Sequence, residues 1–268
     1  MRYIFLGLFI SQLLTANLFA ITIGIVPQQS PFQLMKVWNP IIKYLEKETG
    51  EKIVLKLECS FPKFESELYS GKYDVAYINP YHYIVAHKKI GYIPMVRASE
   101  NLAGIIVVNK NSNITDISMA KDKTFLFPAP NAFAATILVK YELLAYHHID
   151  IDKQNKVLYV NSHNSVYKGV ARGVGDFGSG INRTLNSIKD KQSTNQLTIL
   201  YKTKAYPSHP FAVNPNINEK VREKFTNALL NMPKKLLDSL SIEQIIKTND
   251  AEYDSIRGLI KNFSVGSK

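Results

Sequence analysis

The chain has 268 residues, 46% of them hydrophobic, which is enough for one large domain or two medium ones with a buried core. Its 33 Lys and Arg outnumber 22 Asp and Glu, and the net charge of +11 favours anionic partners such as nucleic acid, lipid headgroups or small acids. Nucleic acid is not expected, because the lysines are scattered and no recognition motif occurs.

Residues 1–20 have the pattern of a secretory signal peptide. Arg2 precedes an apolar run over residues 3–14, which is too short to cross a bilayer, and small residues follow up to Ala20. We expect export and cleavage after Ala20; without cleavage the segment would anchor the protein in the membrane. Because the only cysteine is Cys59, we expect no N-terminal lipid, intramolecular disulfide or cysteine-based metal cluster.

Strands and helices alternate over the next part of the chain. Residues 21–26 alternate and are β-branched, whereas the apolar residues of 32–47 follow helical spacing and are closed by Gly50, a typical C-cap. The pattern repeats, with strands predicted at 53–57 and 74–78 and helices at 61–69 and 80–88. It predicts a mostly parallel sheet with right-handed crossovers, on which ligands bind beyond the carboxyl ends of the strands.

A second set of elements is expected to form a second lobe. Its strands are predicted at 104–108, 124–127, 157–160, 175–178 and 196–201, and its helices at 131–146 and 165–172. The first and last of these strands are interpreted as crossings between lobes. We expect lobe 1 over 21–107 and 204–268, lobe 2 over 108–203, and hinge motion near 107–110 and 201–206.

The C-terminal part is predicted to be helical to its end. After the stretch 206–210, helices are expected at 219–231, 241–248 and 254–263.

Three strand ends are candidates for a ligand site. In the stretch FLFPAPNAFAATI, residues 125–137, two prolines stop a strand and Asn131, a preferred N-cap residue, begins a helix. Another strand runs into Asn79 and Pro80, and a third into the polar run 161–165. Helix N-termini offer free N–H groups and a positive dipole end, so they form an anion site if they face one cleft. Otherwise they are ordinary connections.

His163 follows the third strand end and has two interpretations. It is either a ligand donor or a structural hydrogen-bonding residue, and Ser165 could cap the helix that follows. Asp176 could orient the histidine or serve its turn, and Arg183 could bind an anion or lie on the surface. The tyrosines within 77–83 could line a cleft or simply pack.

Catalysis and metal binding are not expected. Ser162, His163 and Asp176 supply the residue types of a triad, but no Gly-x-Ser-x-Gly elbow occurs. Ser162 and His163 would also point to opposite faces of a strand. The pair His147 and His148 has no metal-ligand spacing around it. We therefore predict neither an enzyme nor a cofactor.

Several segments together resemble one protein family. They are 24–27, 71–77, 79–83, 104–108, 127–135, 162–166 and 173–178. In this order they are similar to the PhnD-like periplasmic binding components of ABC importers for phosphate, phosphite and phosphonate. The resemblance implies an α/β type II periplasmic-binding fold, with two lobes joined by two crossing strands and a ligand cleft between them. It also implies a periplasmic protein that binds a small anionic ligand and serves an ABC permease. We expect a monomer.

The resemblance also implies a ligand-binding loop, and the sequence departs from it. Family members hold phosphoryl oxygens at the helix start matching residues 131–135, with a histidine matching His163 and a tyrosine near Tyr83. That loop usually has several Ser or Thr hydroxyls, whereas this chain has alanines and Phe133. Each lost bond to a charged oxygen costs about 1.5 to 3 kcal/mol, so phosphate should bind more weakly. Phe133 suggests a ligand with an apolar or aromatic part, or a different anion.

We expect the ligand to contact both lobes. The predicted residues are Asn79, Tyr81 and Tyr83 from lobe 1, and Asn131, Ala132, Phe133, Ala134, His163, Ser165 and Arg183 from lobe 2. An alternative function with the same fold is a periplasmic sensor that reports its ligand to a membrane-bound kinase or another partner. Co-purification of a partner would distinguish the two.

Overall fold

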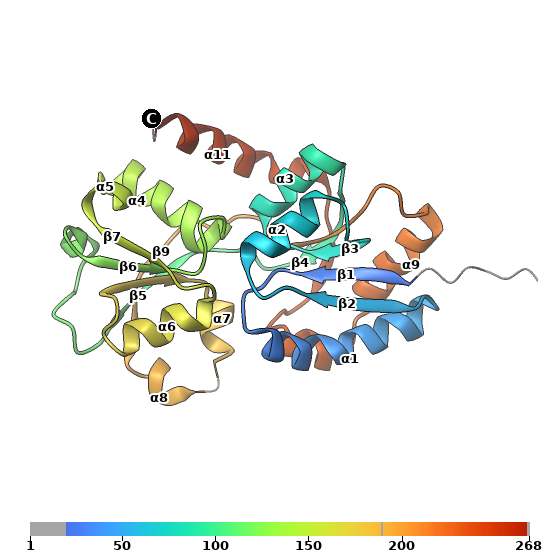
Figure 1. Ribbon diagram of the computed structural model, residues 1–268, viewed down its shortest axis with the longest axis horizontal. Helices are drawn as coiled ribbons and strands as arrows, with labels where there is room; N and C mark the ends of the chain where they lie inside the picture. The colour runs from blue at the N-terminus through green and yellow to red at the C-terminus, as the bar shows by residue number, and fades with distance from the viewer. Residues whose placement is uncertain (1–19, 189, 267–268) are drawn as a thin grey trace, which may run out of the picture.

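The computed structural model describes residues 20–188 and 190–266, so the predicted signal segment up to residue 19 lies outside the described residues. The chain forms two lobes, each built on its own sheet and covered by helices (Figure 1). The predicted α/β class with two lobes is confirmed. Within the described part of the chain, no helix combines the length and the hydropathy needed to span a bilayer.

Lobe 1 has a six-stranded sheet in the order β11-β4-β10-β3-β1-β2. Its strands are β1 (Ile21–Ile25), β2 (Ile53–Leu57), β3 (Val75–Tyr77), β4 (Ile93–Ala98), β10 (Pro210–Val213) and β11 (Ile245–Lys247). β1 pairs in parallel with β2 and β3, as predicted, while β10 and β11 are antiparallel to their neighbours. Its helices are α1 (Pro31–Thr49), α2 (Phe61–Tyr69), α3 (Pro80–Ile90), α9 (Glu219–Leu230), α10 (Lys234–Ser239) and α11 (Asp254–Gly266), with a 3-10 turn η3 (Asp250–Tyr253) before α11.

Lobe 2 has a five-stranded sheet in the order β7-β6-β8-β5-β9. Its strands are β5 (Ile105–Asn109), β6 (Thr124–Phe127), β7 (Lys156–Tyr159), β8 (Phe177–Gly180) and β9 (Leu197–Lys202). β6 is parallel to β7 and β8, and β5 is antiparallel to β8 and β9. Its helices are the 3-10 turn η1 (Ile117–Ala120), the π-helix η2 (Phe133–Leu138), α4 (Val139–His147), α5 (Ile151–Gln154), α6 (His163–Ala171), α7 (Asn182–Asn186) and α8 (Lys191–Thr194).

The chain crosses between the lobes twice, through residues 99–104 and 203–209. Because β5 pairs along its whole length with strands of lobe 2, the predicted boundary after residue 107 and the hinge at 107–110 come too late in the sequence. The second crossing contains the predicted return at residue 204.

The prediction that the C-terminal part is helical to its end is wrong, because this part also contains two strands. Residues 241–248 contain the strand β11, the residues after Pro210 form β10, and β4 has no counterpart among the predicted elements. β11 has only three residues and adds to the edge of the sheet, with Ile245 opposite Ala98. Pairing with a distant strand decides its conformation, and local propensity does not show it.

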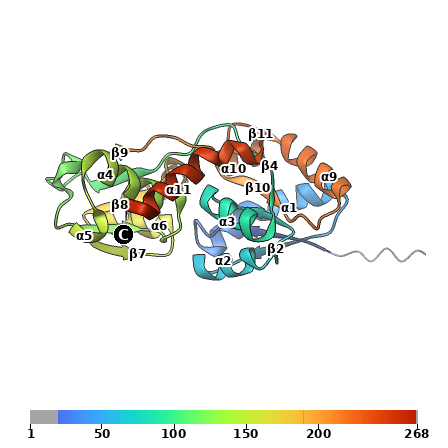
Figure 2. The same cartoon turned by 90° about the horizontal axis from the view of Figure 1, so that it is seen from above.

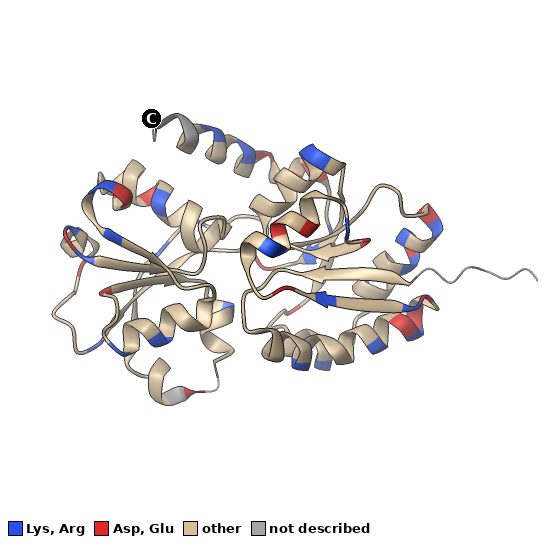
Figure 3. Cartoon of the chain, viewed as in Figure 1, with Lys and Arg blue, Asp and Glu red and all other residues tan. Residues whose placement is uncertain are grey.

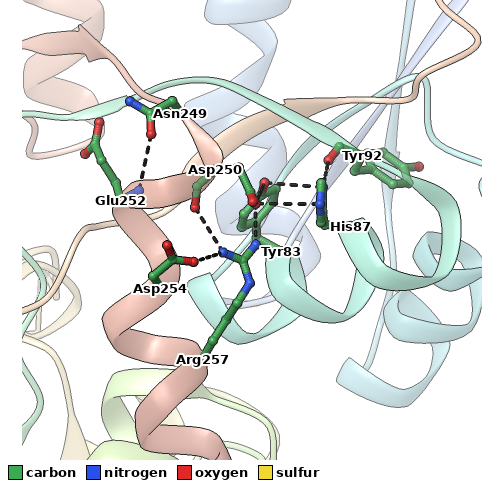
Figure 4. Close-up of polar contacts among 8 residues, drawn as sticks. All are labelled: Tyr83, His87, Tyr92, Asn249, Asp250, Glu252, Asp254 and Arg257. Carbon is green, nitrogen blue, oxygen red and sulfur yellow. Dashed lines mark hydrogen bonds and ion pairs between the residues drawn. The ribbon is translucent and has the colours of Figure 1, made fainter.

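The C-terminal helix α11 extends from lobe 1 across to lobe 2 (Figure 2). At its start Arg257 forms an ion pair with Asp250, which also accepts a hydrogen bond from the hydroxyl of Tyr83 (Figure 4). Near its end the ring of Phe263 lies edge-on to Tyr141 of α4, with 6.5 Å between ring centres. The helix is therefore held by lobe 1 and contacts lobe 2.

Candidate functional site

The two lobes enclose a cavity of about 10 Å³. Its wall is formed by Val26, Gln28, Phe61, Asn79, Leu102, Ala132, Phe133, Ala134, Ala135, His163, Ile181 and His209. Several of these residues follow the carboxyl ends of β1, β3, β6 and β8, which is where the topology places a ligand. The volume admits no more than about one water molecule, so a larger ligand enters only if the lobes move apart.

The loop after β6 reaches the cavity through the start of the π-helix. The N–H groups of Thr136 and Ile137 both donate to the carbonyl of Ala132, at 2.8 and 3.3 Å, which makes this turn wider than an α-turn. The Thr136 hydroxyl donates to the Ala129 carbonyl at 2.8 Å. The N–H groups of residues 133–135 precede the first donor within the helix, and all three residues line the cavity. They are backbone donors suited to an oxyanion.

Close packing against the first crossing positions the π-helix. A Cβ atom on Gly104 would lie 2.2 Å from the carbonyl oxygen of Ala134, so a side chain has no room there. The Gly104 N–H donates to Oγ1 of Thr203 at 2.8 Å, and the Thr203 N–H donates back to the Gly104 carbonyl at 3.0 Å. The two crossings are thus tied to each other and to the backbone beside the cavity.

Asn131 does not cap the helix, contrary to the prediction. Ala132 holds the cap position without a side-chain bond, and Asn131 Nδ2 reaches Glu65 of lobe 1, 3.1 Å from each carboxylate oxygen. Asn79 does cap its helix, accepting from the N–H of His82 at 2.9 Å, and its Nδ2 donates to the Asn131 carbonyl at 3.0 Å. The Asn131 side chain thus bonds the charged Glu65 of lobe 1 instead of capping its own helix. Both asparagines therefore join the lobes.

His163 lies in the first turn of α6 and lines the cavity from lobe 2. Its N–H donates across the cleft to the Gln28 carbonyl at 3.2 Å. The residue is 2% exposed, and burial, together with the positive charge of Arg183, lowers the pKa of His163 to about 3. The ring is therefore neutral at pH 7. Its Nδ1 is buried and has no hydrogen-bond partner among the described residues.

His209 faces the same cavity from the end of the second crossing. Its ring stacks on Tyr77, with 5.5 Å between ring centres, and its Nε2 lies 3.0 Å from Nε2 of Gln28. Burial and the nearby charge of Arg183 lower the pKa of His209 well below its ordinary value. The cavity is therefore lined by two neutral histidines, one on each side.

The predicted site residues divide into those that line the cavity and those that do not. Asn79, Ala132, Phe133, Ala134 and His163 line it. Asn131 adjoins it through its bond to Asn79. The structure thus brings together the two helix starts and the histidine that the strand ends indicated.

Tyr81, Tyr83 and Ser165 lie away from the cavity wall. Tyr83 is fully buried, and its hydroxyl donates to Asp250 of the 3-10 turn η3 (Figure 4). Tyr81 is half-buried and packs against the core of lobe 1. Ser165 is exposed, and its hydroxyl lies 2.9 Å from that of Ser162, the residue that caps α6.

Arg183 lines a larger groove of about 600 Å³ beside the cavity. Its guanidinium carbon lies 5.8 Å from the ring centre of Tyr77, within range of a cation–π contact. Tyr77 in turn packs against Trp38, with 5.2 Å between ring centres. Val26 and Gln28 border both the groove and the cavity. Arg183 therefore influences the histidines by its charge while its side chain lies outside the cavity wall.

Gln28, Ile181 and His209 line the cavity but are absent from the predicted set. Gln28 and Ile181 come shortly after the ends of β1 and β8, so the strand-end rule that selected Asn79 also applies to them. His209 precedes β10, a strand that no sequence pattern indicated.

Charged residues are distributed over both lobes. Figure 3 shows Lys and Arg on helices and loops of each lobe, without one continuous basic face in this view. Among the described residues, no group of three or more His, Cys, Asp or Glu is arranged to hold a metal ion. The polar groups of this cavity are backbone N–H groups, two histidines, Asn79 and Gln28.

Two α/β lobes that are joined by two crossing segments and line a small cavity with a few polar groups define a ligand-binding protein of the periplasmic-binding class. A family model described as "ABC transporter, phosphonate, periplasmic substrate-binding protein" matches residues 23–253, so the chain belongs to that family. The resemblance that the sequence motifs indicated is confirmed.

Known proteins agree with this assignment. Phosphate-import protein PhnD of Mycolicibacterium smegmatis is 21% identical over 226 residues, covering 76% of this chain and 69% of that protein. A binding protein component of an ABC phosphonate transporter from Pseudomonas aeruginosa has a TM-score of 0.83 at 18% identity, covering 93% of this chain and 89% of that chain. PhnD1 from Prochlorococcus marinus in complex with methylphosphonate has a TM-score of 0.84 at 18% identity, covering 91% of this chain and 98% of that chain. These two structures share the fold.

Proposed function

We propose that the protein binds a small oxyanion of the phosphate or phosphonate type between its lobes and delivers it to an ABC permease. The observation that carries this proposal is the meeting of the N–H groups of residues 133–135 with His163 in one buried cavity. Backbone donors at a helix start bind negatively charged oxygens without a metal ion. The names of a phosphate-import relative and of a methylphosphonate complex support this ligand class.

The residues that line the cavity leave backbone N–H groups as the main donors to a ligand. Residues 132–135 carry no hydroxyl, and the Thr136 hydroxyl already donates to the Ala129 carbonyl. A ligand would therefore be held by N–H groups and imidazole rather than by Ser or Thr side chains. Each missing hydroxyl bond to a charged oxygen is worth about 1.5 to 3 kcal/mol, so we expect weaker phosphate binding than in a hydroxyl-rich loop.

Binding is coupled to closure of the lobes in this proposal. The cross-lobe bonds of Asn131 to Glu65 and of His163 to Gln28 exist only when the lobes are together. At the rim, Asn164 Nδ2 donates to Oε1 of Gln33 at 2.8 Å. A ligand that contacts both walls would favour this closed arrangement over an open one.

Calorimetric titration with inorganic phosphate and with methylphosphonate tests the proposal. We expect binding of at least one anion, and we expect His163→Ala to weaken it about tenfold or more, since a bond to a charged group is lost. His147→Ala, at an exposed position at the end of α4, is the matched control and should bind as the wild type does. Absence of heat with both anions would contradict the proposal.

Three further features belong to the proposal. The signal segment is removed on export, the protein acts as a monomer in the periplasm, and it has no catalytic activity. N-terminal sequencing of exported protein, its mass by light scattering and incubation with ester and phosphoester substrates test these features separately. An uncleaved N-terminus, a dimer mass or substrate turnover would each overturn the corresponding feature alone.

A further inference from the structure

The contact between Gln28 and His209 determines which nitrogen of the His209 ring carries its proton. The amide nitrogen of Gln28 lies 3.0 Å from Nε2 of His209, and an amide NH₂ group only donates. In this arrangement of the amide, Nε2 accepts the hydrogen bond. Because the buried ring is neutral, its single proton resides on Nδ1.

The Nδ1–H of His209 is an unused donor at the cavity. The residue is 2% exposed, it lines the cavity, and its Nδ1 is buried with no partner among the described residues. A buried donor without an acceptor costs about 1 to 3 kcal/mol, and an oxygen of a bound ligand would remove that cost. The acceptor that fits is an oxyanion, since the opposite wall also presents donors at residues 133–135.

The cavity wall offers no carboxylate to a cationic group. Its wall, as far as the described residues form it, contains no Asp or Glu. The nearest carboxylate that the site residues contact is Glu65, which is already engaged by Asn131 and by Nε2 of His82 at 3.0 Å. The nearby charge that acts on both histidines is the positive charge of Arg183. An ammonium group buried here would lack a partner and would be repelled.

We propose that His209, with its tautomer fixed by Gln28, donates to the ligand from lobe 1, and that the site takes small oxyanions without an amino group. The inference rests on the proposed function and narrows its ligand class. Gln28 also accepts from the N–H of His163 through its carbonyl at 3.2 Å. Gln28 thus orients His209 through its side chain and bonds His163 of lobe 2 through its backbone when the lobes close.

The test compares methylphosphonate with aminomethylphosphonate, which differs by one amino group, on the wild type and two variants. His209→Leu removes the donor, and His209→Asn keeps an N–H near the position of Nδ1. We expect His209→Leu to lose about tenfold or more in affinity for methylphosphonate, His209→Asn to restore most of it, and aminomethylphosphonate to bind the wild type at least about tenfold more weakly. Melting curves of the free variants verify that they fold.

The outcomes separate this inference from the proposed function. If the wild type binds neither phosphonate nor inorganic phosphate, the proposed function fails and the inference with it. If the wild type binds methylphosphonate but His209→Leu binds it equally well, or the amino compound binds equally tightly, only the inference fails. NMR of the ring nitrogens of wild-type His209 gives a reading that needs no variant: a proton on Nδ1 is expected, and a proton on Nε2 would overturn the assignment.

Discussion

The two walls of the cavity use the same residue types in different ways. Each side has a buried histidine in the wall and an asparagine at a junction between strand and helix: His209 and Asn79 on one side, and His163 and Asn131, which adjoins the wall through its bond to Asn79, on the other. Asn79 caps α3, whereas Asn131 leaves its helix uncapped and bonds Glu65 across the cleft. The difference teaches that a junction motif predicts where a side chain lies but not which partner it takes.

The histidines differ in the same way. His209 is held by side chains, since it stacks on Tyr77 and contacts Gln28. His163 is held through its backbone, by the start of α6 and by its N–H bond to the Gln28 carbonyl. Burial lowers the pKa of both rings and keeps them neutral, although the two histidines lie in distant parts of the chain.

The largest effect on this comparison is expected from pH. Unfolded histidine has a pKa near 6.5, whereas the pKa of folded His163 is lowered to about 3 and that of His209 also lies well below 6.5. Between these values the unfolded state binds more protons, so stability is lost as pH falls below 6.5. Each ring should cost about 1.4 kcal/mol per pH unit in that window. Urea unfolding at pH 7, 6 and 5 measures it, and His163→Gln should reduce the slope by one proton. An unchanged slope in that variant would contradict the assignment to His163.

Gly104→Ala should have the next largest effect, because the new Cβ meets the Ala134 carbonyl. We expect a loss of about 3 kcal/mol in the free energy of unfolding and weaker ligand binding, since the π-helix must shift. Gly173→Ala is the control: it has positive φ but no atom within 4 Å of the added Cβ, so any loss there reflects backbone strain alone. An unchanged free energy of unfolding in Gly104→Ala would contradict the close fit of Gly104 against the Ala134 carbonyl.

Asn131→Ala should separate lobe closure from stability. It removes the bonds to Glu65, worth about 1.5 kcal/mol or more because the acceptor is charged, and so shifts the protein toward an open form. Small-angle scattering should show a larger radius of gyration. Asn79→Ala removes one bond between the lobes, to the Asn131 carbonyl, and should in addition lower the free energy of unfolding by about 1 kcal/mol through loss of the α3 cap. If both variants only unfold more easily, the contrast between the two asparagines is wrong.

The smallest effects are expected at the start of α6. Ser162→Ala removes the cap that accepts from the Ser165 N–H at 3.1 Å and should cost about 1 kcal/mol. Ser165→Ala should change neither stability nor ligand affinity appreciably, because this side chain is exposed and lies off the cavity wall. A clear loss of affinity in Ser165→Ala, measured by titration, would restore that residue to the binding site.

Local patterns were sufficient for much of the fold. The parallel core β2-β1-β3, the helix start at Pro80, and the left-handed C-cap at Gly50 all follow from periodicity, proline and glycine, and α1 begins at Pro31, one residue before the predicted range. β10 and β11 were not predicted, because each is defined by antiparallel pairing with β3 or β4, which lie far away in the sequence. The crossing at 99–104 was placed too late, because the apolar sequence of β5 does not indicate which of the two sheets the strand belongs to.

The site was predictable in outline. Strand ends located Asn79, the start of the π-helix and His163, because sheet topology gathers such ends at one place. The partner of Asn131 was not predictable, since Glu65 is distant in sequence. Tyr83 was expected in the cleft because of the family resemblance, but its hydroxyl bonds Asp250 and the residue does not line the cavity.

The chain has one tryptophan, Trp38, and its place in lobe 1 has a practical consequence. Its indole packs on Tyr77, and the guanidinium of Arg183 from lobe 2 lies near the same phenol ring. Separation of the lobes would withdraw that cation from the neighbourhood of the indole. The intrinsic fluorescence of the unlabelled protein should then change in intensity or wavelength, which would provide an optical gauge of domain movement without any attached dye.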